Sequence, residues 1–177
     1  MVGYYFFSLN DPATWLETGW LLGIGSLALV IATYDLRYME IPITLLVVSA
    51  VLTLLFLILE FHAGEPFSAS RLGSGLLGGG VVALFFFSLV FASRETWMGW
   101  GDVWLGFVAG MAVGLPSALF MLTLSFALGA GIGVAGILLC GKNLKSQIPF
   151  APFLVCGMLF TIFFPRVFPE FVQYFLF

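Results

Sequence analysis

The residues from Val103 to Gly141 include no charged side chain, and this long uncharged run constrains the fold more than any other feature of the chain. A single helix over that range, at about 1.5 Å per residue, would be nearly twice as long as the roughly 30 Å hydrocarbon core of a bilayer. The run must therefore turn back. Gly114-Leu115-Pro116 is the natural break, because proline removes a backbone donor and disfavours a helical conformation in the residue before it. We expect a short fourth helix before this break and a fifth that reaches about Cys140.

The rest of the chain has the same character, with 62% apolar residues, 8% charged residues and a mean hydropathy of +1.14. A water-soluble domain carries about a quarter charged residues, so this composition excludes one. Further spans are expected at Trp15–Tyr34, Ile43–Phe61 and Leu72–Ser93, and a last span is expected to start after Pro149 or Pro152 and to reach about Phe164. The sequence therefore predicts an all-α integral membrane protein, a bundle of about six transmembrane helices. The aromatic tail, Phe171 to Phe177, is expected to lie at the membrane interface.

Six spans place three connecting loops on one face of the membrane: Asp35–Pro42, Arg94–Asp102 and Gly141–Gln147. Four basic residues belong to these loops and two to the opposite side; the four are Arg37, Arg94, Lys142 and Lys145, and the two are Arg71 and Arg166. Because cytoplasmic loops carry an excess of Lys and Arg, the three-loop face is expected to be cytoplasmic. The four basic residues of the three loops are interpreted as topology and lipid-headgroup residues.

Charge and residue types exclude several kinds of site. A formal net charge of -3 leaves no basic stripe for nucleic acid. The cysteines, Cys140 and Cys156, form no CxxC pair, which excludes a disulfide scaffold and a four-thiolate zinc site, and both are expected to be buried apolar thiols. His62 is the only histidine, so chemistry that needs two histidines is excluded. We expect no metal and no cofactor.

Glycines recur at every fourth residue in the predicted membrane helices. Gly106, Gly110 and Gly114 follow this spacing, and the pairs Gly75/Gly79 and Gly129/Gly133 repeat it. Small residues at this spacing let membrane helices approach closely, and we interpret these glycines as packing positions.

Two of the nine acidic residues, Asp35 and Asp102, lie at predicted helix boundaries on the same side of the membrane. Taken singly, Asp102 has an equally good interpretation as a helix N-cap, and Asp35 as a partner of Arg37. As a pair, two converging carboxyl groups cannot easily both ionise, so one keeps a proton while the other stays anionic. Such a pair can draw a proton from water and donate one to a carbonyl, as aspartic proteases do. Gly99 and Gly101 beside Asp102 would let a substrate backbone approach.

Three segments occur in the order found in a known family: Asp35–Pro42 (DLRYMEIP), Met98–Val103 (MGWGDV) and Ile148–Leu154 (IPFAPFL). With them the chain resembles the type IV prepilin leader peptidases, which are GxGD aspartic peptidases, over nearly its whole length. The resemblance implies a catalytic dyad of Asp35 and Asp102. It also implies that Gly99 and Gly101 are the glycines of GxGD, and that the last helix starts at a proline-broken motif that contains Pro149, Phe150 and Pro152.

The resemblance further implies that residues 1–177 are a single membrane-embedded aspartic peptidase domain that needs no cofactor. The implied substrate is a prepilin or pseudopilin precursor, whose short basic leader ends in glycine and is cut at the cytoplasmic face. The other expected partner is membrane lipid, and self-association into a homo-oligomer is left open. The expected location is the cell membrane, or the inner membrane of a Gram-negative cell, as a multi-pass protein whose active site faces the cytoplasm.

The chain departs from the family pattern in three respects. It carries no paired CxxC motifs of the N-terminal methyltransferase domain, and so looks like a short form that has peptidase activity only. Trp104 stands where the family commonly has Lys, and Ala151 stands where it usually has Gly.

Trp104 leaves open a degenerate family member that binds pilins without cutting them, and two alternative functions of other kinds remain. The first is a nonenzymatic membrane transport or assembly subunit, in which Asp35 and Asp102 are loop caps or an ion site. The second is a presenilin-like GxGD intramembrane protease, which Tyr34-Asp35 fits, although the Pro-Ala-Leu motif of that family is absent from the last helices. Glu40 and Glu95 are weak candidates for binding a basic leader and are better interpreted as solvated loop residues.

Overall fold

A computed structural model describes residues 12–61, 71–96, 98–115, 117–140 and 149–167. Every regular element within these residues is an α-helix, in the order α1 (Pro12–Tyr38), α2 (Ile43–Phe61), α3 (Arg71–Ser93), α4 (Trp100–Val113), α5 (Ser117–Cys140) and α6 (Ala151–Val167). Four of these helices have spans that are long and apolar enough to cross a membrane: Trp15–Tyr38, Ile43–Glu60, Arg71–Ser93 and Ser117–Gly136. The predicted all-α membrane bundle is therefore confirmed, with α4 and α6 as its two shorter apolar helices.

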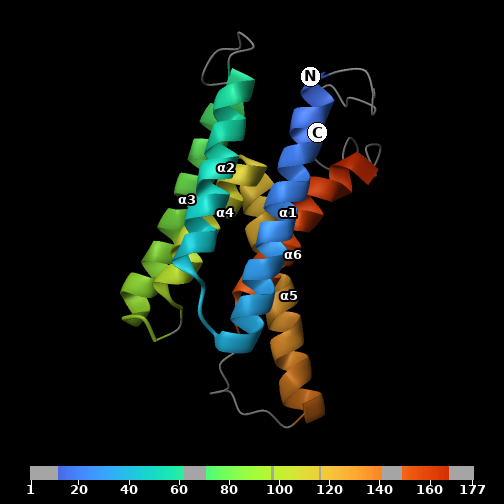
Figure 1. The fold of residues 1–177 in the computed structure, drawn as a ribbon. Helices are drawn as coiled ribbons and strands as arrows, with labels where there is room; N and C mark the ends of the chain where they lie inside the picture. The colour runs from blue at the N-terminus through green and yellow to red at the C-terminus, as the bar shows by residue number, and fades with distance from the viewer. Residues whose placement is uncertain (1–11, 62–70, 97, 116, 141–148, 168–177) are drawn as a thin grey trace.

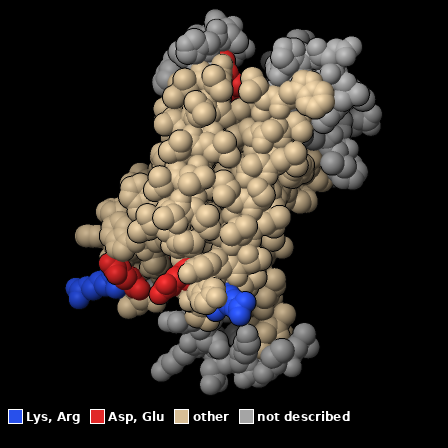
Figure 2. All heavy atoms as spheres, in the orientation of Figure 1, with Lys and Arg blue, Asp and Glu red and all other residues tan. Residues whose placement is uncertain are grey.

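The short helix α4 occupies the inside of the bundle, where it packs against α2, α3, α5 and α6 (Figure 1). Helix α1 packs against α2 and α6. Large apolar side chains remain on the outside, among them Leu22, Leu84 and Leu138. The Lys, Arg, Asp and Glu side chains visible in Figure 2 lie near the ends of the bundle, with uncharged surface between them. This distribution suits a protein whose helices are surrounded by lipid.

Helices α3 and α4 pair closely through glycines, of which Gly79 and Gly110 belong to the predicted spacing and Gly78 does not. A β-carbon added to Gly78 would lie 2.6 Å from the carbonyl oxygen of Gly110, and one added to Gly110 would lie 2.6 Å from the carbonyl oxygen of Gly78. A β-carbon added to Gly79 would lie 2.8 Å from the carbonyl oxygen of Phe107. The interpretation of these glycines as packing positions is confirmed for this helix pair.

The break between α4 and α5 lies at the predicted position. Gly114 has φ +71°, a left-handed conformation that glycine adopts without steric cost. The amide of Leu115 donates to the carbonyl oxygen of Ser74 on α3, which fixes the turn to the neighbouring helix. Pro116 lies outside the described residues.

Three predicted helix boundaries were wrong. Helix α1 continues through the charged residues to Tyr38 and ends where Met39 adopts φ +53°. Helix α4 starts at Trp100 and not at Val103, so Asp102 lies in its first turn and Gly99 takes the N-cap position. Helix α6 passes Pro165 and ends at Val167, because a proline removes one hydrogen bond of a helix but does not always end it.

One further prediction was wrong: Cys156 is an exposed free thiol on α6. The side chain of Cys140 lies outside the described residues, as do His62, the loop with Lys142 and Lys145, and the tail from Phe171 to Phe177.

Candidate active site

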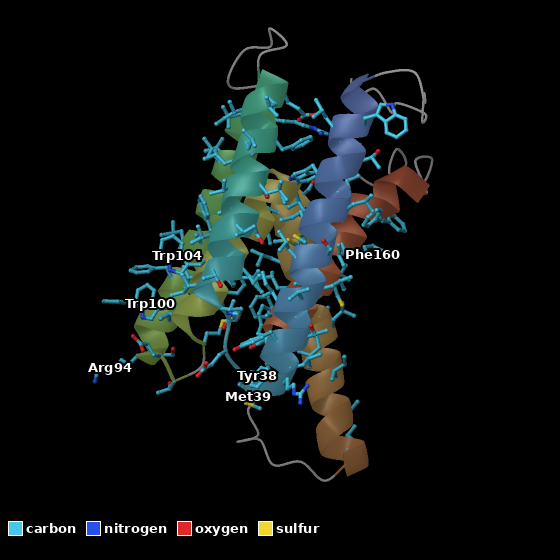
Figure 3. All side chains as sticks on the ribbon, viewed as in Figure 1. Tyr38, Met39, Arg94, Trp100, Trp104 and Phe160 are labelled. Carbon is cyan, nitrogen blue, oxygen red and sulfur yellow. The ribbon has the colours of Figure 1, made fainter. Side chains whose placement is uncertain are left out.

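The end of α1 and the start of α4 lie at the same end of the bundle. Figure 3 shows Tyr38 and Met39 from the α1 end near the level of Arg94 and Trp100 from the α3–α4 connection. Asp35 lies in the last turn of α1, and Asp102 lies in the first turn of α4. The alternation of the helices therefore brings two carboxyl groups from distant parts of the sequence to one end of the molecule.

Asp35 is buried, with 6% of its surface exposed. Its Oδ2 accepts a hydrogen bond of 3.2 Å from the backbone amide of Ala151, the first residue of α6. No salt bridge joins Asp35 to any basic side chain in the described part of the chain, so Arg37 is not its ion partner there. The guanidinium of Arg37 instead lies 5.7 Å from the ring centre of Tyr38.

Asp102 folds back on the turn that precedes it. Its Oδ2 accepts a hydrogen bond of 3.4 Å from the amide of Gly99, while its own amide donates to the carbonyl oxygen of Gly99 at 3.1 Å. A carboxylate at the third helical position that reaches back to the N-cap amide satisfies one of the free donors at a helix start. Its other oxygen, Oδ1, is buried and has no hydrogen-bond partner among the described residues. Asp102 thus contributes to the helix start and keeps one oxygen without a partner.

The electrostatics of Asp102 show that Asp35 is its neighbour. Asp102 lies outside the four long spans, and its pKa is raised to about 6 from the ordinary value of 3.8. Burial is the largest cause, because desolvation disfavours the charged form; the negative charge of Asp35 raises the pKa further, and the hydrogen bond from Gly99 lowers it. A carboxyl group with a pKa near 6 and an acidic neighbour can hold a proton at a pH where an ordinary aspartate has lost it.

The two glycines of the GxGD motif have different surroundings. A β-carbon on Gly101 would lie 3.1 Å from Cβ of Ile41, so Gly101 allows the segment after α1 to lie close against α4. A β-carbon on Gly99 would meet nothing nearer than the amide nitrogen of Gly101 at 3.9 Å, and Gly99 has an extended backbone with φ -90°. Close packing therefore accounts for Gly101 but not for Gly99.

The predicted proline-containing motif positions the start of α6. The ring of Phe150 packs 4.9 Å from that of Phe126 on α5 and 5.6 Å from that of Phe86 on α3, measured between ring centres. The carbonyl oxygen of Phe150 accepts hydrogen bonds from the amides of Phe153 and Leu154. Pro149 precedes this anchor, and Pro152 is the second residue of the helix. The motif thus places the amide of Ala151 against Asp35.

Two features of this end could not be read from the pattern of residue types. The first is the amide of Ala151, since every residue except proline offers a backbone donor. The second is a hydrogen bond of 2.7 Å from Nε1 of Trp100 to Oε1 of Glu95, which ties the connection before α4 to its first residue. Arg94 and Glu95 have φ values of +50° and +64°, so this connection is a tight turn. Trp104 is 60% exposed and points away from the bundle (Figure 3).

Comparison with known proteins supplies one match. A family model described as the type IV leader peptidase family matches residues 22–134, more than half of the chain. The matched range contains Asp35, Gly99, Gly101 and Asp102, and it ends before the motif at the start of α6. Searches of curated proteins and of solved structures find no match.

Proposed function

Because the chain belongs to the type IV leader peptidase family, we propose that it is an aspartic endopeptidase that removes the basic leader from type IV prepilin or pseudopilin precursors. The observation that carries this proposal is the placement of two acidic groups at one end of the bundle, Asp35 in the last turn of α1 and Asp102 in the first turn of α4. Both lie at the end of the bundle that we assign to the cytoplasmic face by the excess of basic residues in its loops. A precursor whose hydrophobic helix stays in the bilayer would present its leader junction there.

The proposed reaction is a direct attack of water on the scissile carbonyl. One aspartate, as carboxylate, takes a proton from the water, and the oxygen of that water bonds to the carbonyl carbon. The other aspartate, as carboxylic acid, protonates the carbonyl oxygen. The tetrahedral intermediate then collapses: the carbon–nitrogen bond breaks, the amine nitrogen takes up a proton from the dyad, and the dyad regains its single proton. No covalent bond forms between enzyme and substrate.

A membrane cleavage assay tests the function. The chain is coexpressed with a panel of prepilins, and the loss of the leader is followed as a mobility shift. We expect Asp35→Asn and Asp102→Asn to abolish cleavage, because an amide can neither accept the proton from water nor return it. Glu60→Gln is the matched control, since it removes a carboxyl group near the opposite end of the bundle, where Glu60 pairs with Arg71 at 2.9 Å.

Three results separate the hypotheses. Cleavage by the wild type and by Glu60→Gln but by neither aspartate variant supports both the class of peptidase and the dyad. Cleavage by a folded Asp35→Asn or Asp102→Asn variant would show that the dyad is wrong. A folded wild type that leaves the whole panel uncut would contradict the proposed substrate class.

A further inference from the structure

The two aspartates of the proposed dyad are held differently, and this difference bears on which of them is the base. Asp35 receives a hydrogen bond of 3.2 Å from the amide of Ala151, on a separate helix. Asp102 receives only a longer bond of 3.4 Å from Gly99, within its own turn. Hydrogen bonds that a carboxyl oxygen accepts favour its anionic form. Hydrogen bonding from a separate helix therefore favours the anionic form of Asp35 in a way that has no counterpart at Asp102 among the described residues.

Helix direction adds to this difference. Ala151 is the first residue of α6, so its amide is one of the donors that a helix leaves without an intrahelical acceptor. The amino-terminal end of a helix carries a partial positive charge and stabilises an anion close to it. Asp35 itself lies in the last turn of α1, where the partial charge of its own helix is negative. Helix α6 therefore supplies the donor and the favourable partial charge that α1 does not.

The donor is fixed in place by packing. Ala151 has no exposed surface, and Phe150 before it lies in the aromatic cluster with Phe126 and Phe86. A donor held in this way needs no reorganisation when charge develops near it, which is what makes preorganised amides effective in active sites.

Among the residues that the structure describes, the other charged groups near Asp35 do not supply the same stabilisation. Asp102 faces it from α4 and repels a second negative charge. Arg37 is on the same helix but forms no salt bridge with Asp35 in the described structure, in which the two salt bridges join Arg71 to Glu17 and Glu60. Helix α2 contains one charged residue, Glu60, and helix α6 contains one, Arg166; each is near the end of its helix that lies away from Asp35. Cys156, also on α6, is exposed.

We propose that the backbone amide of Ala151 is the positioning group of the dyad: it keeps Asp35 anionic, so that Asp35 is the general base and Asp102 the general acid. This inference rests on the proposed peptidase function. In the first step Asp35 takes the proton from water and Asp102 gives its proton to the carbonyl oxygen. Breaking of the carbon–nitrogen bond transfers the proton from Asp35 to the amine, and Asp102 recovers its proton from the hydroxyl of the intermediate as the carbonyl re-forms. Atoms and charges balance, and the enzyme returns to its starting state.

Two variants remove the amide hydrogen. Ala151→Pro has no donor, and proline is tolerated in the first turn of a helix. Replacement of the residue 151 amide by an ester, with lactic acid in place of alanine, removes the same hydrogen without adding the proline ring. Either variant is compared with the wild type for kcat, KM and the pH dependence of cleavage of a prepilin in membranes.

We expect kcat to fall by about tenfold to a hundredfold in both variants, with KM changed by less than about threefold, because the interaction acts on the reacting groups. We also expect the acid limb of the pH profile to move to higher pH by about one unit, the size of one charge-assisted hydrogen bond. The direction follows because a base that loses its stabilising donor is protonated, and so inactivated, at a higher pH.

Matched variants control for general effects. Ala151→Gly keeps the amide and is expected to keep the acid limb at the wild-type pH. Ile43→Pro places a proline at the first position of α2, where the side chain is exposed, and controls for insertion of proline at a helix start.

The proposal is overturned if the ester variant is folded and cleaves with the wild-type kcat and acid limb while Asp35→Asn and Asp102→Asn are inactive. That result would leave the peptidase function intact and remove only the role of Ala151. Failure of the wild type to cleave the panel is a different result, and it would count against the proposed function itself. Should Ala151→Pro not fold, the ester variant decides.

Discussion

The backbones of Gly78 on α3 and Gly110 on α4 are so close that a β-carbon on either would lie 2.6 Å from the carbonyl oxygen of the other. The nearest atom on each side is a backbone carbonyl oxygen, which cannot move aside as the end of a flexible side chain can; Cγ2 of Val82 also lies 2.9 Å from the β-carbon on Gly110. The two helices are therefore held at a separation that only glycine permits. Since α4 carries Asp102 in its first turn, this contact also fixes the position of one acidic group of the site.

We expect Gly110→Ala to destabilise the bundle by about 2–3 kcal/mol, at the upper end of the usual cost of overpacking, because backbone must shift. Unfolding in mixed detergent micelles measures the change. Gly80→Ala on α3 is the matched control: an added β-carbon there meets nothing within 4 Å, so the variant should equal or exceed the wild-type stability. Equal losses for both variants would show that the close contact is not the cause.

Asp102 should make the folded protein less stable as the pH rises. Its pKa is about 6 in the folded chain, against an ordinary value of 3.8, so the folded state binds this proton more tightly than the unfolded state does. The contribution of Asp102 to the free energy of unfolding is most favourable below about pH 4. It declines as the pH rises through 6 and is constant at higher pH. The difference between the two pKa values corresponds to about 3 kcal/mol in the free energy of unfolding, since each pKa unit is worth about 1.4 kcal/mol.

Thermal unfolding of the wild type and of Asp102→Asn between pH 4 and pH 8 measures this contribution by difference. The asparagine variant should lack this part of the pH dependence and should be the more stable protein at pH 7.5. Parallel curves for the two proteins would contradict a raised pKa at Asp102.

Cleavage should be sensitive to substitution of Gly101, because Ile41 packs closely against it. An alanine there would place its β-carbon 3.1 Å from Cβ of Ile41, and the segment after α1 would have to move away from α4. Small displacements of reacting groups are costly, so we expect Gly101→Ala to lower the rate of prepilin cleavage by about tenfold. The double variant Gly101→Ala/Ile41→Ala should recover part of the loss. If the two substitutions merely add, the contact is not what limits the rate.

Phe150, which directly precedes α6, should contribute more to stability than an aromatic residue on the outside of α6. Its ring packs against Phe126 and Phe86 inside the bundle, so we expect Phe150→Ala to cost about 3–4 kcal/mol. Phe160→Ala is the control, because Phe160 is 43% exposed and points outward in Figure 3. A smaller loss for Phe150 than for Phe160 in detergent unfolding would contradict the anchoring of α6 by Phe150.

The sequence determines the bundle more clearly than the helix ends. Uncharged runs and the Gly114 break predicted the helices, because lipid leaves a spanning backbone no other way to satisfy its amides. The end of α1 could not be predicted: Leu36, Arg37 and Tyr38 are compatible with both a helix and a loop. The left-handed conformation of Met39 ends the helix, and it is rare for a residue other than glycine.

The candidate site was accessible from the sequence only through its side chains. Asp35 and Asp102 stand out because acidic groups are scarce in so apolar a chain, and the alternation of helices puts both at one end. The role of the Ala151 amide cannot be predicted from the sequence in this way, because a backbone donor does not depend on residue type. The contact between Gly101 and Ile41 likewise depends on the path of the chain after α1, which residue spacing does not define.

The shortness of α4 has a consequence for the surrounding lipid. Its fourteen residues extend only about 21 Å, well short of the roughly 30 Å of a hydrocarbon core. Helix α4 is enclosed by other helices over most of its surface but is exposed at Trp100 and Trp104. The hydrophobic mismatch at these residues is relieved where the bilayer thins beside them, which would bring headgroups and water inward toward Asp102. The length of the lipid acyl chains would then affect the rate of cleavage. In vesicles made from lipids with longer acyl chains, and so with thicker bilayers, the rate of cleavage should fall. A rate that does not depend on acyl-chain length would show that the dyad receives its water by another route.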